Sequence, residues 1–145
     1  MAERANRKLT ASLRRQHPID FIEQVLIDPE TGRPFVLLPA ERAFLEHAFK
    51  TGPNGKLLYS EWVYSCPKKS GKTTFEAIIE LTMVLLYGGA FPEAYILANS
   101  LEQGKGRVFE ICCRIVTASP LLANEAVITA DKIALPAGAR RKRMR

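Results

Sequence analysis

Residues Cys66–Thr73 read CPKKSGKT, and this stretch lies between two segments of opposite character. Before it, Tyr59–Ser65 (YSEWVYS) is rich in aromatic and β-branched residues, which favours a β-strand. After it, Thr73–Tyr87 is apolar on nearly all sides, which is typical of a helix buried against a sheet. Gly88-Gly89 supplies a stop for that helix. The sequence therefore predicts a strand, a glycine-containing loop and a helix in direct succession.

The end of this loop matches the Gly-Lys-Ser/Thr pattern of a Walker A loop, which binds nucleotide phosphates between a strand and a helix. Its backbone N–H groups would surround the phosphates, and the positive end of the following helix would point at them. We expect Lys72 to pair with the β- and γ-phosphate oxygens, and the Thr73 hydroxyl to ligate Mg²⁺. Thr74 is placed to donate to the α-phosphate. The predicted ligands are thus ATP and Mg²⁺, and the predicted nucleotide-binding residues are Lys69, Ser70, Gly71, Lys72, Thr73 and Thr74.

Cys66 stands where the full Walker A pattern has its first glycine. The alternative interpretation of Gly-Lys-Thr is an ordinary helix N-terminus with a solvated lysine. Cys66 itself is expected to be a small buried residue at the end of a strand, because no histidine or acid is placed by sequence to activate its thiol. Trp62 is expected to pack in the core.

The segments after the loop continue the alternation of strands and helices. Ala94–Ala98 (AYILA) has the fully apolar character of a strand in a parallel sheet. Ser100–Gln103 has the form of a capping box, from which a helix should run towards Ser119-Pro120. Ala126–Thr129 and Ile133–Leu135 are candidates for two short final strands. This order favours right-handed βαβ units, and hence an α/β fold with a mostly parallel sheet.

The segments before the loop add two helices. Pro18 opens a helix with an apolar stripe that should stop at Asp28-Pro29. Asp28–Pro34 (DPETGRP) has the composition of a turn. Phe35–Leu38 is a short apolar run suited to a buried strand, and Ala40–Phe49 reads as a second helix. Thr51–Lys56 (TGPNGK) should break that helix.

The composition excludes several functional classes. The chain has 145 residues, 47% hydrophobic and 25% charged, which fits one globular domain. Its three cysteines form no CxxC pattern or even disulfide framework, and its two histidines lie far apart, so disulfide-rich and metalloenzyme classes are not expected. No secretory signal opens the chain, and its apolar runs are shorter than the ~20 residues that span a bilayer. We expect a protein without a membrane association.

The net charge of +6 is concentrated at the two ends. Residues 1–15 carry +4 and residues 137–145 carry +5, which leaves −3 for the rest. Basic ends can bind phosphate backbones by releasing counterions, although charge runs at chain ends are more often simply solvated. The predicted organisation is a basic arm over residues 1–17, a partial ATPase domain over 18–136, and a basic tail over 137–145.

The chain resembles the N-terminal ATPase region of the large subunit of tailed-phage terminases, the motors that package DNA into procapsids. Four stretches carry the resemblance in the order of the family, over roughly Asp20 to Leu135: FIEQVLIDPETGRPFVLL (21–38), PAERAFLEHAF (39–49), CPKKSGKT (66–73) and AYILANSLEQGKGRVFEICCRIVTASPLL (94–122).

This resemblance implies a three-layer α/β/α fold of P-loop NTPase type, located in the cytoplasm of a bacterial host. It also implies double-stranded DNA, a terminase small subunit and a portal as partners. Lys68 takes the position of a family arginine that senses nucleotide, and this makes Lys68 a candidate catalytic residue together with Lys72. The family's adenine-binding glutamine has no counterpart in Pro39–Arg42. Gln103 is read as a helix cap first and a coupling residue second.

A working motor of this family also needs an aliphatic strand that ends in Asp-Glu, a coupling motif and a nuclease, and none of these follows. Ala126–Asp131 (AVITAD) approaches the first of them, but Thr129 interrupts the run and no glutamate follows Asp131. We therefore expect an incomplete fold, very slow hydrolysis by this chain alone, and an unpaired backbone edge on Tyr59–Ser65.

Two other functions stay open. One is a non-catalytic remnant or small packaging accessory that binds DNA or a partner through its basic ends. The other is a small P-loop kinase, for which too little chain follows Leu122 to supply an acceptor site and an arginine-bearing lid.

Overall fold

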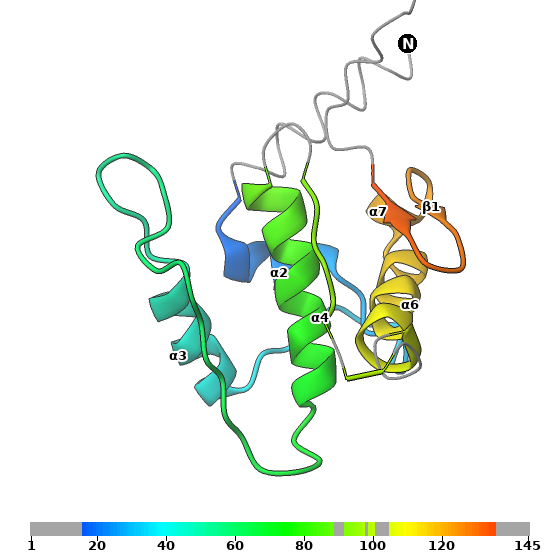
Figure 1. The fold of residues 1–145 in the computed structure, drawn as a ribbon, viewed down its shortest axis with the longest axis horizontal. Coiled ribbons are helices and arrows are strands. Elements are labelled where there is room, and N and C mark those ends of the chain that lie inside the picture. Colours follow the sequence, from blue (N-terminus) through cyan, green and yellow to red (C-terminus); the bar gives the residue numbers. More distant parts are fainter. Residues whose placement is uncertain (1–15, 89–91, 98, 101–104, 136–145) are drawn as a thin grey trace, which may run out of the picture.

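The computed structural model describes residues 16–88, 92–97, 99–100 and 105–135. Along the chain its elements are α2 (Pro18–Val25), α3 (Pro39–Ala48), α4 (Lys72–Thr82), the π-helical segments η1 (Met83–Tyr87) and η2 (Lys105–Phe109), α6 (Glu110–Ala118), α7 (Pro120–Ala123), β1 (Val127–Ile128) and β2 (Ile133–Ala134). Segment η1 continues α4, and η2 leads directly into α6. In Figure 1, α4 occupies the middle of the molecule, between α3 and α6.

Helix α2 begins with Pro18 in its first turn, as the sequence predicts, because an N-terminal residue has no intrahelical N–H bond to lose. The predicted end at Asp28-Pro29 is wrong: α2 ends at Val25, and Leu26 is already extended. The extended conformation lets the carbonyl of Leu26 accept a hydrogen bond from Phe35 N at 3.2 Å. The returning chain thus competes with the last turn of the helix and ends it early.

The turn predicted over Asp28–Pro34 is confirmed. Asp28 O accepts from Gly32 N at 2.8 Å, and Gly32 has a φ of 67°, which suits a residue without Cβ. The strand predicted over Phe35–Leu38 is wrong, because only an isolated bridge, Ile27 to Pro34, precedes it. The backbone N–H of Leu37 donates instead to the Glu23 carboxylate at 3.3 Å. A side chain of α2 therefore takes the place of a neighbouring strand.

Helix α3 spans Pro39–Ala48, one residue off the predicted range at each end. The Glu41 carboxylate accepts from Leu38 N at 2.9 Å, so the helix is capped by its own first turn. The predicted break after it is confirmed by the bridge between Thr51 and Leu57.

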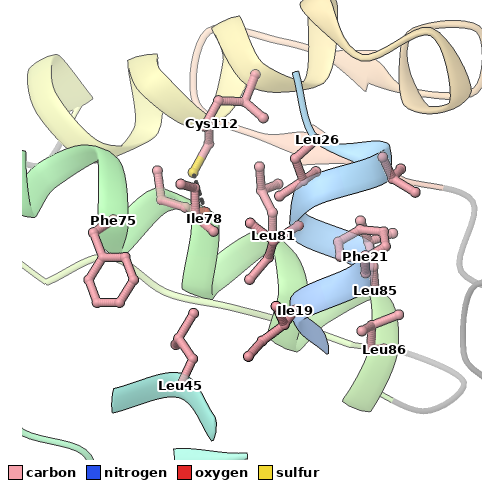
Figure 2. Close-up of a cluster of buried hydrophobic side chains, with 14 of the residues drawn as sticks. Ile19, Phe21, Leu26, Leu45, Phe75, Ile78, Leu81, Leu85, Leu86 and Cys112 are labelled. Carbon is pink, nitrogen blue, oxygen red and sulfur yellow. Dashed lines mark hydrogen bonds between the residues drawn. The ribbon is translucent and has the colours of Figure 1, made fainter. Parts of the chain in front are cut away.

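The helix predicted over Thr73–Tyr87 is confirmed as α4 and η1, which together run from Lys72 to Tyr87. This long element packs against both α2 and α6. The side chains between them form the core shown in Figure 2, in which the Cys112 thiol of α6 points at the backbone of α4. Cys112 Sγ lies 3.9 Å from Ala77 O. Of the two adjacent cysteines, Cys112 is buried in the core and Cys113 is half-buried.

The predicted helix end at Ser119-Pro120 is also confirmed, since α6 stops at Ala118 and α7 starts at Pro120. The two short strands predicted near the end of the chain exist as β1 and β2. They pair antiparallel, with Val127 opposite Ala134 and Ile128 opposite Ile133. Most of the predicted capping box lies outside the described residues. So do residues 1–15 of the predicted basic arm over 1–17 and the whole predicted tail over 137–145.

The parallel sheet expected from the sequence is not formed among the described residues. The only strands there are β1 and β2. Tyr59–Ser65 and the described part of Ala94–Ala98 are without strand pairing, on either side of α4 in Figure 1. Their outward side chains include Val63, Tyr95 and Leu97, which are exposed. Both predicted strand segments thus lack the backbone partner that would define a strand, and the α/β fold class stays a prediction.

No helix within the described ranges is long and apolar enough to cross a membrane.

Candidate functional site

The loop predicted to bind phosphate lies between the extended Glu61–Ser65 segment and the first turn of α4. It bends sharply at two points: Lys69 has a φ of 64° and Gly71 a φ of 78°. A positive φ costs little at glycine but about 1 kcal/mol or more at a residue with a Cβ, so the turn at Lys69 is held by its surroundings. Ser70 Oγ contributes by donating a 2.7 Å hydrogen bond to Pro67 O across the loop.

Three lysines make this loop strongly positive. Lys68, Lys69 and Lys72 are all exposed. Ion pairs within the described residues join Arg42 with Glu23 and Arg114 with Glu110, and none involves a lysine of the loop. The three ammonium groups are therefore available to an anion from solvent.

The first turn of α4 adds backbone donors beside the lysines. Gly71 precedes the helix in a left-handed conformation, and no side chain caps the helix. The first N–H groups of any helix lack intrahelical acceptors, so those of Lys72, Thr73 and Thr74 are left for another acceptor. The hydroxyls of Thr73 and Thr74 are half-exposed in the same turn. All six predicted nucleotide-binding residues thus lie together in one loop and one helical turn.

Cys66 is half-buried at the start of the loop, close to the place expected for it. The neighbouring Tyr64 ring packs between α3 and α4, with its centroid 5.0 Å from that of Phe44 and 4.8 Å from that of Phe75. Burial raises the pKa of Tyr64, and electrostatic interactions with Cys66 and Glu41 raise it further. The beginning of the loop is therefore anchored to the two helices by aromatic contacts.

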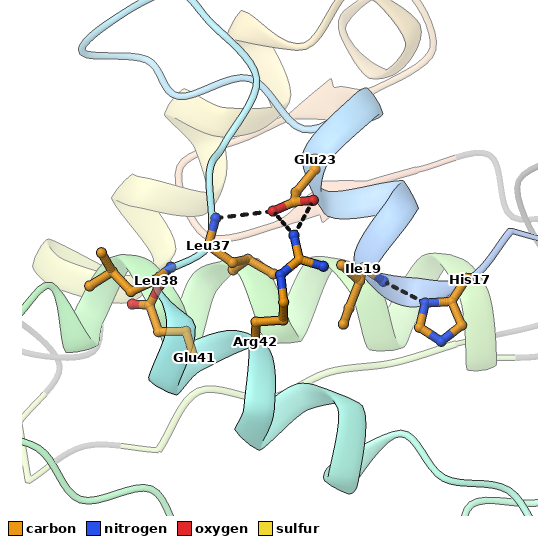
Figure 3. Close-up of polar contacts among 7 residues, drawn as sticks. All are labelled: His17, Ile19, Glu23, Leu37, Leu38, Glu41 and Arg42. Carbon is orange, nitrogen blue, oxygen red and sulfur yellow. Dashed lines mark hydrogen bonds and ion pairs between the residues drawn. The ribbon is translucent and has the colours of Figure 1, made fainter.

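The side chains of Glu41 and Arg42, in the stretch Pro39–Arg42 that has no glutamine, make contacts with other parts of the protein. Arg42 Nη2 donates to both Glu23 carboxylate oxygens, at 2.5 and 2.6 Å, which ties α3 to α2 (Figure 3). The Glu41 carboxylate is held by Leu38 N. Both side chains thus make contacts within the protein.

The acid that the sequence offers for a Walker B strand is Asp131, at the end of Ala126–Asp131. Asp131 lies in the turn between β1 and β2, where its carboxylate accepts from Thr129 Oγ1 at 3.2 Å. Figure 1 shows this hairpin beside α7, away from the loop at the foot of α4. Ala126–Asp131 therefore does not form a Walker B strand beside this loop. Gln103, predicted as a helix cap or coupling residue, lies outside the described residues.

Neither the potential metal ligands nor the pKa shifts of the described residues indicate a second functional site. Within the described ranges, no group of three or more histidine, cysteine or acidic side chains could hold a metal ion. Sequence reasoning did miss the pair of acidic side chains Glu76 and Glu80 on α4, which face the Cys112 region. Burial, followed by the charge of Glu80, raises the pKa of the Cys112 thiol to about 12, so this thiol is inert. In the sequence, the only sign of the Glu76 and Glu80 pair is their i, i+4 spacing on one helix.

Comparison of the chain with protein-family models, with curated proteins and with solved structures gives no match.

Proposed function

We propose that this chain binds the phosphates of ATP through Cys66–Gly71 and the first turn of α4, as the nucleotide-binding part of a DNA-packaging ATPase of terminase large-subunit type. The observation that carries the proposal is the combination of three exposed, unpaired lysines with an uncapped N-terminus of an 11-residue helix. A helix N-terminus with adjacent cations is suited to a phosphate chain, because backbone dipoles and side-chain charges act on the same anion.

Each residue has a separate task in this proposal. Lys72 neutralises the β- and γ-phosphates, and Lys68 adds a second cation from the other side of the loop. Thr73 supplies a hydroxyl to the Mg²⁺ that accompanies ATP, and Thr74 donates to the α-phosphate. Lys69, Ser70 and Gly71 shape the backbone around the phosphates.

Hydrolysis by this chain alone is expected to be very slow. Phosphoryl transfer is catalysed by positioning and by stabilising the charge that develops on the γ-phosphate. No aliphatic run in this sequence ends in Asp-Glu, so the water-activating acid has no candidate here. The proposal includes a parallel sheet of P-loop type, for which Tyr59–Ser65 and Ala94–Ala98 supply strands, and it includes DNA, a small subunit and a portal as partners in a bacterial host.

A second candidate is a non-catalytic packaging accessory. The exposed Val63, Tyr95 and Leu97 on the two extended segments favour it, because exposed apolar residues beside unpaired backbone suit a protein partner.

The phosphate site is tested by titrating a fluorescent ATP analogue with Mg²⁺ against the wild type and Lys72→Ala. Loss of a charge-assisted contact of about 1.5–3 kcal/mol weakens binding roughly 10- to 100-fold. Lys56→Ala, which removes an exposed lysine outside the loop, is the matched control and keeps wild-type affinity. Equal affinity for the wild type and Lys72→Ala would remove the phosphate-binding proposal.

Two glycine-to-alanine variants distinguish an effect on the shape of the loop from an effect on overall stability. Gly71 and Gly32 both have positive φ and open space where a Cβ would stand. Alanine at either position strains the backbone, but only Gly71→Ala should weaken ATP binding. Phosphate release by the wild type should stay at background in the same samples.

A further inference from the structure

The segment Glu61–Ser65 has the exposure pattern of an edge strand without its neighbour. Trp62 and Tyr64 are half-buried, whereas Glu61, Val63 and Ser65 between and beside them are exposed, so alternate side chains face the core and the solvent. Within the described residues, no backbone N–H or C=O of this segment takes part in a hydrogen bond. Val63 is 81% exposed. The backbone of Glu61–Ser65 therefore presents a row of free hydrogen-bond donors and acceptors, and such a row recruits another strand.

Aromatic contacts hold this segment in its extended form. The Trp62 ring meets Phe49 edge-on at 4.8 Å between centroids, while Tyr64 contacts both Phe44 and Phe75. The inner face is thus fixed on α3 and α4, and in Figure 1 the chain descends past α3 to the foot of α4 with no strand beside it. A pre-shaped strand loses little conformational entropy when a partner pairs with it.

Proline, lysine and a bulge, which protect many sheet edges, are absent from this segment. Glu61–Ser65 has only a single charge, at its first position. Residues 1–15 and 136–145, which the structure does not describe, are basic and contain no alternating β-branched or aromatic run. These two segments therefore lack the sequence pattern of a partner strand.

The sequence of the segment is complementary to itself in antiparallel register. With Val63 opposite Val63, each Trp62 faces a Tyr64 of the other copy, and each Glu61 faces a Ser65. The aromatic pairs meet on the inner face and the valines meet on the outer face. Such cross-strand pairs stabilise a sheet, and no like charges oppose each other in this register. A two-fold axis through Val63 makes this interface closed, so it ends at a dimer.

We propose that Glu61–Ser65 pairs antiparallel with the same segment of a second copy of this chain, with the two Val63 residues facing each other across a two-fold axis. The second copy is chosen as the partner because the sequence of this segment is complementary to itself. Backbone hydrogen bonds between the two strands supply most of the contact.

Cysteine cross-linking tests the register directly. Residues directly opposite in antiparallel strands have Cα atoms about 4.5–5.5 Å apart, within the range of a disulfide. In a Cys66→Ser background, which removes the thiol three residues away, Val63→Cys should oxidise to a covalent dimer. Val36→Cys, at a position that is 85% exposed outside the segment, is the matched control and should stay largely monomeric.

Sedimentation velocity over a series of concentrations measures the association without any cysteine change. Val63→Lys places two ammonium groups opposite each other and should weaken the dimer about tenfold or more. Val36→Lys should leave the dimer unchanged. At concentrations low enough for the wild type to be monomeric, both variants should keep the wild-type melting temperature, because both side chains are exposed.

Several results would overturn the proposal. They are a monomeric wild type at all concentrations, equal cross-linking of the two cysteine variants, an open-ended series of oligomers, and association that Val63→Lys does not weaken. If the wild type stays monomeric until a separately produced strand-forming polypeptide is added, the edge belongs to that polypeptide and not to a second copy.

Discussion

At the scale of single residues, Ser119 joins two distant parts of the chain. Its side chain is fully buried, donates to Ile115 O at 2.7 Å and accepts from Ile27 N at 2.9 Å. The second bond spans 92 residues of sequence and satisfies a backbone donor just after α2. Nothing in the local sequence singles out this serine from the other hydroxyl residues.

We predict that Ser119→Ala lowers the free energy of unfolding by about 1–3 kcal/mol, because it leaves the Ile27 N–H without an acceptor. Thr117→Ala is the control, since Thr117 Oγ1 donates to Cys113 O at 2.8 Å in the same helix but is exposed. Urea denaturation of the three proteins decides the matter, and an equal loss for both variants would contradict the role of the long-range bond.

Glu80 should make stability depend on pH. Burial raises the pKa of its carboxyl from 4.5 to about 7, and the charge of Glu76 adds to the shift. Because the folded state binds this proton more tightly than the unfolded state, its contribution is complete below pH 4.5 and is lost as the pH rises through about 7. Glu80→Gln should therefore melt at a higher temperature than the wild type at pH 8, and at a similar temperature at pH 4.5.

Thermal melts at the two pH values test this, with Glu46→Gln on the exposed face of α3 as the control. A melting temperature for Glu80→Gln that stays below the wild-type value at pH 8 would show that the ionised carboxylate is satisfied in the fold.

At the scale of elements, a single carboxylate connects α2 with α3 and with the segment between them. Glu23 accepts from Arg42 and from Leu37 N (Figure 3). The side chains of Arg42 and Glu23 are 41% and 25% exposed, whereas those of Arg114 and Glu110, an i, i+4 pair on α6, are 60% and 54% exposed. The first pair joins two elements and the second only two turns of one helix.

We predict a larger coupling energy for the first pair. A double-mutant cycle with alanine at Glu23 and Arg42 should give about 0.5–1 kcal/mol, and one at Glu110 and Arg114 about 0.3–0.5 kcal/mol or less. Chemical denaturation of the single and double variants supplies the values. The same coupling in both cycles would mean that bridging two helices adds nothing to this ion pair.

At the scale of the whole molecule, charge is divided between the ends and the body. Residues 1–15 and 137–145 hold all of the positive excess, and the rest carries −3. Neither end contains an aromatic residue that could stack on bases. Any contact of the ends with DNA is therefore expected to be electrostatic and independent of sequence.

The affinity of the chain for double-stranded DNA should fall steeply as salt rises, and it should disappear when residues 1–15 and 140–145 are deleted. Each phosphate contact contributes about −0.9 to the slope of log K against log salt. Fluorescence anisotropy with two unrelated duplexes at several salt concentrations measures both properties. Binding that survives the deletion, or that prefers one duplex, would place the DNA site on the folded body.

The sequence by itself determined the local elements. Proline in the first turns of α2 and α3, the glycines at Gly32 and Gly71, and the apolar character of α4 act through steric limits and burial that a short window already contains. The lysine-rich loop at the start of α4 is readable for the same reason, since its residues are neighbours along the chain.

Only the tertiary structure decided how these elements meet. The early end of α2 follows from the Phe35 bond to Leu26, and the loss of a strand at Phe35–Leu38 follows from the Glu23 carboxylate taking Leu37 N. Tyr59–Ser65 has the composition of a strand, but a strand also needs a backbone partner, and pairing is a property of two segments. β-Propensity depends on the local sequence, so the residues of Tyr59–Ser65 favour an extended backbone by themselves. Hydrogen-bond partners come from other parts of the fold, and none of the described residues supplies one for Glu61–Ser65.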